Sequence, residues 1–461
     1  MADPTGSKER RPSILPLFIA GLLVPAALGS SQTIFNDGDV SWHIATGQWI
    51  LDHRAIPQAD PFSFTWAGKP WVPIEWLSEV FYASAYRLAG YSGIAALVTA
   101  ALIALHFIVY SNAARWVRTP LLAIVAMDFA LIPMLLARPH VLSWPILVWW
   151  VWLMLRAREH DRAPPLIAAL LMALWANLHG GFVFGLAIAA AFGLEAFVSS
   201  TDRMRALRQW LIFGAACAIA VFINGNGVEG VFHPLRFTHL AMLPLIDEWK
   251  PSSPQTTPVF FAVLAVTLAL IVWKRPRLHW VRWLLLLGFL GFALFQVRQQ
   301  AMVAIISAML LPQGFAGKKE QDASDPTMRW VVLGGAALLV AVRAALPLSP
   351  PDNEANPWKL IASVPAELRS QPVLNGYTMG GPLILSGIRP YVDGRGDMYG
   401  DELVVGYYRI AQGDPKAFAD AVTRWNIRWA ILPLHSKLIP LLDRTPGWRR
   451  VRQDKVGAIY V

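Results

Sequence analysis

The chain contains almost no cysteine. Among its 461 residues there is one, Cys217, inside the apolar run LIFGAACAIAVFI. A single thiol excludes a disulfide within the chain and a metal site built on cysteine pairs. Histidine, carboxylate and guanidinium side chains are therefore the groups left for any chemistry that this sequence encodes.

Charge is also scarce. Only 15% of the residues are charged and 55% are hydrophobic, whereas soluble domains average about 25% charged and about 45–50% apolar residues. The composition is typical of a polytopic membrane protein whose partner is the lipid bilayer, and the 21 tryptophans suit its two interfaces with water. The net charge of +10 would favour nucleic acid in a soluble protein. Here the basic residues fall in short loops between apolar runs, so no nucleic-acid partner is expected.

Long apolar runs fill the first three quarters of the chain. A span needs about 20 apolar residues, and this criterion predicts about eleven spans. They lie at 13–30, 91–110, 119–137, 141–156, 165–178, 181–198, 208–223, 257–273, 279–296, 299–313 and 328–347. No clear cleavage site follows the first run, so it is interpreted as an uncleaved span. The break NLHGG, at 177–181, is interpreted as a tight turn between two helices.

The basic clusters predict the orientation. If the spans alternate, most clusters fall on one side of the membrane, at 8–11, 115–118, 156–162, 202–208, 273–277 and 317–320. Cytoplasmic loops carry the excess of lysine and arginine. We therefore expect a transmembrane domain over 1–347 with its N-terminus in the cytoplasm, and an outward-facing loop at 31–90.

The sequence changes character after the last apolar run. The linker SPPDNEANPW leads into short strand-like runs, RPYVD, RWAILP, GWRRVRQD and VGAIYV, with the helical pattern DPKAFADAVTRW among them. Such alternation predicts a small α/β domain at 351–461, on the outer side like the C-terminus.

Most unusual polar residues lie on the predicted outer face. Asp37 and Asp39 follow the first span directly, at the start of GDVSWHIATGQWILDH, whose apolar spacing predicts an interfacial helix with Asp39 as its N-cap. WVPIEWLSEVFYASAYRLAG, at 71–90, predicts a second interfacial helix. Any chemistry is therefore expected on the outer face.

This outer loop carries a resemblance to a known group. An acidic residue after the first span, an interfacial helix and the turn PQADPFS together resemble the GT-C superfamily of membrane glycosyltransferases. WHIATGQWI, WANLHGGFVFG, IDEWKPSSP and YVDGRGDMYGD extend the resemblance over most of the chain, which looks like a bacterial branch close to the aminoarabinose and protein O-mannosyltransferases. Those enzymes have Asp-Glu where this chain has Asp39-Val40.

The resemblance implies a GT-C-like fold and an inverting glycosyltransferase in the bacterial inner membrane, with its site on the periplasmic face. The donor would be a polyprenyl-phosphate-linked sugar, and the acceptor an envelope glycan, lipid or protein. The first outer loop of such enzymes carries the essential carboxylate, which places it on Asp39, with Asp37 in support. A positioned base contributes typically about 10²–10⁴-fold.

Other polar residues are candidates for binding the substrates. A phosphate leaving group requires cations, and Arg298 stands at the mouth of two apolar spans, where a charge is costly. The candidate substrate-binding residues are His43, Glu75, Arg138, His140, His179, Arg236, Glu248 and Arg298.

Structural explanations compete with these roles. His43 suits a structural hydrogen bond, Asp60 a turn, and Arg138 and Arg298 contacts with lipid headgroups. No cofactor is expected, and the metal is left open, because Asp37, Asp39 and Glu248 are oxygen ligands only if they converge.

Two readings without catalysis remain beside the enzyme. A transporter or flippase for a lipid-linked intermediate would place ionisable residues near the bilayer midplane and often shows repeats. This sequence has no visible repeat, and only Asp128, inside MDFALIPMLL, fits that pattern. A scaffold for such an intermediate, held through the C-terminal domain, is the other reading.

Overall fold

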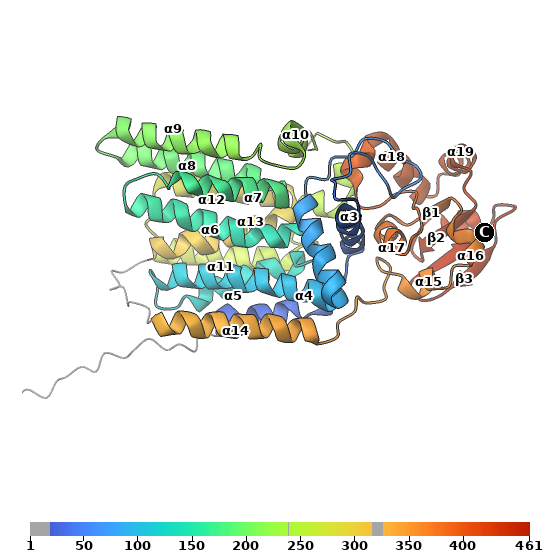
Figure 1. Cartoon of the computed structure of the whole chain (residues 1–461), viewed down its shortest axis with the longest axis horizontal. Coiled ribbons are helices and arrows are strands. Elements are labelled where there is room, and N and C mark those ends of the chain that lie inside the picture. The colour runs from blue at the N-terminus through green and yellow to red at the C-terminus, as the bar shows by residue number, and fades with distance from the viewer. Residues whose placement is uncertain (1–18, 238, 316–325) are drawn as a thin grey trace, which may run out of the picture.

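The computed structural model describes residues 19–237, 239–315 and 326–461 and is mostly helical. Long helices lie side by side in a bundle, and a smaller unit with a β-sheet sits at one end of it (Figure 1). The bundle contains α4 (Trp76–Ala114), α5 (Leu121–Leu131), α6 (Pro139–Glu159), α7 (Leu170–Leu178), α8 (Phe182–Ser199), α9 (Arg203–Ala220), α11 (Pro258–Lys274), α12 (Trp280–Phe295), α13 (Gln300–Gly314) and α14 (Pro326–Ala345).

Short helical elements precede and connect the bundle helices. They are η1 (Ile19–Leu23), α2 (Val24–Gly29), η2 (Gln32–Phe35), α3 (Asp39–His53), η3 (Ile132–Met134), η4 (Leu166–Ala169), α10 (Gly227–Phe237), η5 (Leu243–Leu245), η6 (Asp247–Trp249) and η7 (Val297–Gln299).

The bundle has the helices of a multi-pass membrane protein, but the predicted number of spans needs correction. By length and composition, three described helices can cross a membrane, namely α4, α6 and α8. A helix lies within every predicted span. Several of these helices, such as Pro258–Lys274 and Trp280–Phe295, are too short to meet the length criterion for a membrane span. The prediction of about eleven spans is therefore corrected to three helices that are each long and apolar enough to cross a membrane. The basic clusters at 8–11 and 317–320 lie outside the described residues.

Local sequence explains why some predicted spans fall short. Pro133 follows α5 closely, within η3, and proline cannot supply the N–H that an α-helix needs. Helix α9 carries Arg203, Arg205 and Arg208 at its start, which lowers its apolar character. These breaks are local features that a count of apolar residues in a window averages out.

Both predicted interfacial helices of the 31–90 loop are confirmed as helices. The first is α3, which lies between the bundle and the sheet-bearing unit (Figure 1). The second forms the start of α4 and is joined to the following span through a break at Ala89 and Gly90. Gly90 has a φ of 58°, a conformation that glycine adopts without steric cost, so the chain turns here from the loop into the bundle.

The C-terminal region forms one four-stranded sheet with short helices around it. Strands β1 (Val373–Asn375), β2 (Trp429–Pro433), β4 (Gly457–Tyr460) and β3 (Arg450–Gln453) lie in that order, with β1 and β2 parallel and the other neighbours antiparallel. The helices are α15 (Trp358–Ala362), α16 (Ala366–Arg369), η8 (Tyr377–Met379), α17 (Gly380–Leu385), α18 (Gly396–Ala411), α19 (Pro415–Trp425) and α20 (Ile439–Leu442).

Three of the four predicted strands are present, and the strand at RPYVD is wrong. In this segment the backbone N–H of Tyr391 donates to Asn375 Oδ1 and the carbonyl of Val392 accepts from Asn375 Nδ2, each at 2.8 Å. A buried side chain thus takes the partners that a strand would find in a ladder, and Pro390 lacks an N–H to donate. Strand β1, which precedes this segment, was not predicted.

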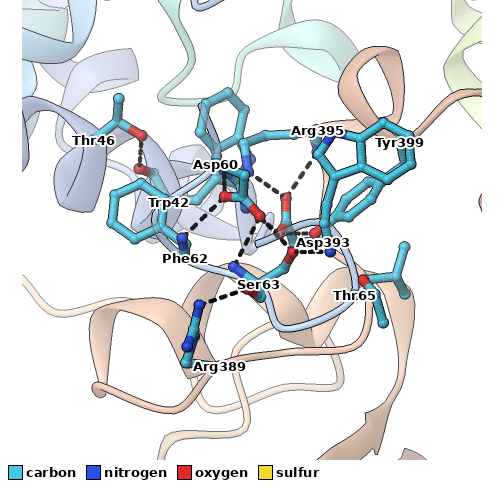
Figure 2. A network of polar contacts seen from close by, with 12 residues as sticks. Trp42, Thr46, Asp60, Phe62, Ser63, Thr65, Arg389, Asp393, Arg395 and Tyr399 are labelled. Atoms are coloured by element: carbon cyan, nitrogen blue, oxygen red, sulfur yellow. Dashed lines mark hydrogen bonds and ion pairs between the residues drawn. The ribbon is translucent and has the colours of Figure 1, made fainter. Parts of the chain in front are cut away.

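The C-terminal region packs closely on the 31–90 loop. A core cluster joins Trp42 and Trp71 of that loop to Tyr391 and Tyr399. At its centre, Arg395 donates to both oxygens of Asp393, at 2.8 and 2.7 Å, and to Asp60 Oδ1 at 2.7 Å (Figure 2). Segments more than 300 positions apart in sequence are therefore joined by a charged network with no solvent exposure of its side chains.

Asp60 serves two purposes in this network. It accepts hydrogen bonds from the backbone N–H groups of Phe62 and Ser63, at 2.9 and 3.0 Å, which is the turn that the sequence predicts for PQADPFS. It also receives Arg395 from the C-terminal region. The turn is thus the attachment point of the two regions.

A second buried network holds the bundle together through Glu195. Its Oε2 and Oε1 each accept from Arg282 at 2.8 Å, and Oε1 also lies 3.4 Å from Arg158. Glu195 is 4% exposed. The residues come from α8, α12 and α6, so one carboxylate pairs with guanidinium groups from two other helices.

We expect Glu195→Ala to lower the free energy of unfolding by about 3–5 kcal/mol, because removing one partner leaves buried charge without compensation. The measurement is thermal unfolding of the purified chain in lipid nanodiscs. Glu159→Ala is the control, since Glu159 is 24% exposed and binds Arg115 and Arg156 nearer the surface. Equal losses in the two variants would contradict the prediction.

Candidate active site

The 31–90 loop places two carboxylates at the start of α3. Asp39 is the first residue of the helix, and its backbone N–H donates to Asp37 Oδ1 at 3.0 Å. The N-cap position is Gly38, without a side-chain cap. The prediction that Asp39 caps the helix is therefore wrong, because Asp37 takes that part. The Asp39 carboxylate remains available for other partners.

Arg138 brings these carboxylates together with a third. It precedes Pro139 at the start of α6 and is extended, with φ −122° and ψ 160°, as expected for a residue before proline. Its guanidinium bonds to Asp37, lies 2.9 Å from Asp39 Oδ2 and donates to Glu248 Oε2 at 2.8 Å. Two neighbouring carboxylates, Asp37 and Asp39, and the distant Glu248 thus converge on one cation.

Glu248 and Arg298 enter from two further short helices. Glu248 lies in η6 and Arg298 in η7, and the two segments are joined by a bond from the N–H of Val297 to the carbonyl of Lys250 at 3.0 Å. Arg298 lies 3.7 Å from Glu248 Oε1, and its guanidinium stacks 4.4 Å from the ring centre of Trp249. We call Asp37, Asp39, Arg138, Glu248 and Arg298 the acid–guanidinium cluster.

The acidic members of the cluster differ in proton affinity. Burial, followed by the charge of Asp37, raises the pKa of Asp39 from 3.8 to about 7, against the attraction of Arg138. Burial also acts to raise the pKa of Glu248, but Arg138 and Arg298 outweigh it and hold that pKa below its usual value. Near neutral pH, Asp39 is therefore the carboxylate of this pair that can take up and release a proton.

A second group of titratable residues lies beside the cluster. His43 Nδ1 is 3.4 Å from Glu79 Oε1, and His43 Nε2 is 3.9 Å from Glu75 Oε2. His179 Nε2 is 3.4 Å from Glu75 Oε1. Burial raises the pKa of Glu75 to about 8, so this carboxyl group is largely protonated at neutral pH.

The histidines of this group are neutral. Burial, with help from Arg138, lowers the pKa of His43, and burial with help from Arg298 lowers that of His179. His179 Nδ1 accepts the N–H of Gly181 at 3.0 Å, so its Nε2 carries the proton. His140 Nε2 faces the Met134 carbonyl at 3.2 Å, and its ring lies 6.4 Å from that of His179.

The structure brings together all the predicted site residues except one. Arg236 pairs with Glu229 on the surface of α10 and is 59% exposed, and no contact joins it to the cluster within the described part of the chain. His233, from the same helix, lies 2.9 Å from Asp397 at the start of α18. This helix therefore contacts the C-terminal region rather than the acid–guanidinium cluster.

Sequence reasoning missed contributions from the C-terminal region. A Cβ atom on Gly394 would lie 2.0 Å from Asp39 Oδ1, so this glycine lets the backbone close over the carboxylate. The charges of Asp39, Asp393 and Glu248 all act on Tyr377, whose hydroxyl lies close to Gly396. The glycines in NGYTMGG and VDGRGD were the sequence features that could have predicted these contacts, because a close approach of the backbone requires glycine.

The oxygen ligands considered for a metal do converge, but on a guanidinium. Asp37, Asp39 and Glu248 all contact Arg138. Among the described residues, no group of three or more histidine, cysteine or acidic side chains has an arrangement that would hold a metal ion. The carboxylates as arranged here fit a cation that the protein itself supplies.

Comparison with solved structures gives the fold a precedent. The archaeal oligosaccharyltransferase AglB from Archaeoglobus fulgidus, in complex with an inhibitory peptide and a dolichol-phosphate, overlaps with a TM-score of 0.52 at 11% identity, over 90% of this chain and 69% of that one. The apo form of the Archaeoglobus fulgidus oligosaccharyltransferase gives 0.48 at 10% identity over the same shares. No protein-family model matches the sequence, and no curated protein matches it either.

At this identity the first overlap shows the fold alone. The chain shares its overall fold with an oligosaccharyltransferase, which is consistent with the fold that the sequence resemblance implies. The overlap extends over nine tenths of this chain, so it includes most of the bundle together with the C-terminal region. The chain thus has the overall fold of that oligosaccharyltransferase, with a small sheet-bearing C-terminal unit.

Proposed function

We propose that this chain is an inverting glycosyltransferase. It transfers a sugar from a polyprenyl-phosphate-linked donor to an envelope acceptor, on the periplasmic face of a bacterial inner membrane, with 351–461 as its extracytoplasmic domain. The observation that carries the proposal is Asp39, a buried carboxylate with a pKa near 7 that lies 2.9 Å from the Arg138 guanidinium, in a cluster that also contains Arg298. The AglB structure, with its dolichol-phosphate and peptide, supports a lipid-linked donor and a separate acceptor.

In the proposed reaction the acceptor oxygen attacks the anomeric carbon of the donor sugar. The bond from that carbon to the phosphate oxygen breaks, and the phosphate leaves with the electron pair. Asp39 accepts the proton that the acceptor hydroxyl loses. Attack opposite the leaving group inverts the anomeric centre and needs one base, unlike the pair of carboxylates that flank the bond in hydrolases.

The leaving phosphate requires a cation with unused hydrogen-bond donors. Arg138 is engaged by three carboxylates. Arg298 has only a 3.7 Å approach to Glu248 and a stacking contact with Trp249, and it is 29% exposed. Arg298 is therefore the phosphate ligand in this proposal, and Arg138 holds the carboxylates in place. His179, a neutral donor through Nε2, completes the polar wall.

The rate of transfer should increase with pH up to about 7 and then level off. Asp39 must be ionised to act as a base, and its pKa is raised to about 7, so each pH unit below that value should cost about tenfold in rate. The measurement is single-turnover transfer across this range, with donor binding measured in parallel as the control. A rate that stays flat, or that falls above pH 7 as donor binding stays constant, would contradict the assignment.

Arg298→Gln should weaken donor binding by about tenfold to a hundredfold, because hydrogen bonds to charged groups contribute about 1.5–3 kcal/mol. Arg236→Gln is the matched control, since Arg236 is a surface arginine paired with Glu229 outside the cluster. Binding of a polyprenyl-phosphate sugar to each variant in nanodiscs provides the comparison. If both variants bind the donor equally well, Arg298 does not hold the phosphate.

The decisive test of the function uses the wild-type chain. The protein is reconstituted with polyprenyl-phosphate sugars and a cell-envelope extract, and sugar transfer and donor binding are scored separately. Transfer to an extract component supports the enzyme. Binding of the lipid-linked sugar without transfer or hydrolysis would instead favour a transporter or a scaffold.

The residue that most suggested a transporter has a structural partner. Asp128 on α5 lies 2.8 Å from His106 Nε2 on α4, and His106 Nδ1 lies 2.7 Å from the carbonyl of Leu102. The Asp128 carboxyl group therefore has a hydrogen-bond partner inside the bundle. This pair joins two bundle helices, so Asp128 is explained without a transport pathway.

A further inference from the structure

A cavity of about 250 Å³ lies on the C-terminal unit, apart from the acid–guanidinium cluster. Its walls come from the loop after Asp60 and from α18 and α19, and include Trp66, Tyr399, Arg409, Asp420 and Trp425. Helices α18 and α19 lie beyond the end of the bundle (Figure 1). The cavity therefore lies outside the helix bundle, and its volume is below the roughly 300–1,000 Å³ of sites for drug-sized ligands. It suits a single small ring.

The lining combines aromatic walls with a rim of both charges. Trp66 and Trp425 are half-buried, and Tyr391 and Tyr399 are buried behind them. Lys69 stacks on Trp66 at 4.2 Å and Arg424 on Trp425 at 5.1 Å, which fixes both indoles. The rim carries basic and acidic side chains together, namely Lys69, Glu402, Arg409, Asp420 and Arg424.

This chemistry matches a neutral sugar ring better than an ion or a peptide. The C–H faces of a pyranose are apolar and bury against indole rings. Its hydroxyls both donate and accept, so they can satisfy carboxylates and guanidinium groups on one rim. Because the rim carries both signs of charge, a charged ligand of either sign would be repelled by some of these side chains. The described lining residues include none from the sheet, so a peptide could not add to it as a strand.

One residue links the cavity to the candidate active site. Tyr399 forms part of the cavity wall, and its hydroxyl donates to Asp393 Oδ2 at 2.6 Å. Gly394, which follows Asp393 in the chain, lies against the Asp39 carboxylate. Figure 2 shows Tyr399 beside Asp393 and Arg395 in this network. The cavity is therefore connected to the proposed base through Tyr399, Asp393 and Gly394.

We propose that this cavity is a binding site for one neutral pyranose of a glycan acceptor. The inference rests on the proposed function and narrows it, because it selects a glycan from among the envelope glycans, lipids and proteins considered as acceptors. The sugar ring lies between Trp66 and Trp425, and its hydroxyls bond to Asp420 and Arg409. The acceptor hydroxyl belongs to a neighbouring unit of the same glycan, which extends toward Asp39.

The test is saturation-transfer NMR on the full chain in phosphatidylcholine nanodiscs. Maltoside detergents are avoided because their headgroups resemble the probe. The probes are mannobiose, cellobiose and N,N′-diacetylchitobiose, with glucuronic acid and glucosamine as charged comparisons. We expect at least one neutral disaccharide to receive saturation at its ring C–H protons, and the charged sugars to receive less.

Variants identify the site. Trp66→Ala should weaken binding by about tenfold, given the usual contribution of an aromatic contact together with the apolar area lost, whereas Trp66→Phe should retain most of it. Asp420→Asn and Arg409→Gln change exposed side chains, so they test the rim without risk to folding. Asp52→Asn, which changes an exposed side chain of α3 that pairs with Arg87, should bind the disaccharide as the wild type does.

Two results would overturn the proposal. One is the absence of saturation for every neutral disaccharide with the wild-type chain. The other is binding that persists unchanged in Trp66→Ala, Asp420→Asn and Arg409→Gln. Failure of the enzyme proposal is distinguishable, because disaccharide binding without any sugar transfer leaves the cavity assignment intact and removes only the catalytic one.

Discussion

Asp39→Asn should reduce sugar transfer by about 10²–10⁴-fold, the usual contribution of a positioned general base, while donor binding persists. The amide can still accept a hydrogen bond from Arg138, which lies 2.9 Å from Asp39 Oδ2, so the site keeps its geometry. It cannot take up the proton of the acceptor hydroxyl. Transfer and donor binding are measured on the same nanodisc preparation.

The matched control is Asp52→Asn. Asp52 lies on the same helix, is 61% exposed and pairs with Arg87 at 2.5 Å, so its loss should leave transfer unchanged. Equal transfer by Asp39→Asn and Asp52→Asn would show that Asp39 is not the base. Loss of donor binding together with transfer in Asp39→Asn would instead assign Asp39 to the donor site.

The thermal stability of Asp39→Asn is an independent test of the raised pKa of Asp39. The pKa of Asp39 is raised in the folded chain from 3.8 to about 7, so its ionisation favours unfolding as the pH rises through this window. At about 1.4 kcal/mol for each pKa unit, the effect at pH 8 is on the order of 4 kcal/mol. Asp39→Asn should therefore unfold at a higher temperature than the wild type at pH 8, and show little difference at pH 4.

Arg395→Gln should lower the free energy of unfolding by about 3–5 kcal/mol, because Asp60 and Asp393 would be left in the core without their cation. All three side chains have no exposure to solvent. The guanidinium also stacks 4.7 Å from the ring centre of Trp71. Thermal unfolding measures the loss, and transfer should fall as well, because the same network holds Gly394 against Asp39.

Two further variants make this prediction specific. Arg395→Lys keeps the charge but lacks the planar fork that binds both oxygens of Asp393, so an intermediate loss is expected. Arg389→Gln is the control, since Arg389 is exposed and makes one hydrogen bond of 3.1 Å to the Ser63 carbonyl of the same loop. A stable Arg395→Gln variant would show that the network is not what joins the two regions.

The sequence allowed the helix positions to be predicted better than their lengths. Apolar runs marked a helix at each expected place, because burial in lipid or protein requires them. The length of each helix depends on breaks such as Pro133 and on arginines at helix starts, as in α9. The strand predicted at 389–393 failed for a related reason, since one distant side chain, Asn375, takes its backbone partners.

Most residues of the candidate site could be predicted from the sequence, but their arrangement in space could not. Asp37, Arg138 and Glu248 stand out in the sequence as polar residues beside apolar runs, but about 100 positions separate each from the next. Only the fold shows that Arg138 contacts both of the others. The position of Arg236, outside the cluster, follows equally from the fold, because its local sequence resembles that of the others.

The close contact between Gly394 and Asp39 has a consequence for the synthesis of the protein. A ribosome makes Asp39 about 350 residues before it makes Gly394, which at about 5–20 residues per second is roughly 20–70 s. Throughout that interval the helices enter the membrane with the carboxylate uncovered. A segment that is translated late thus covers a carboxylate that is translated early, and a product that ends before Gly394 would carry every described helix of the bundle without a finished site.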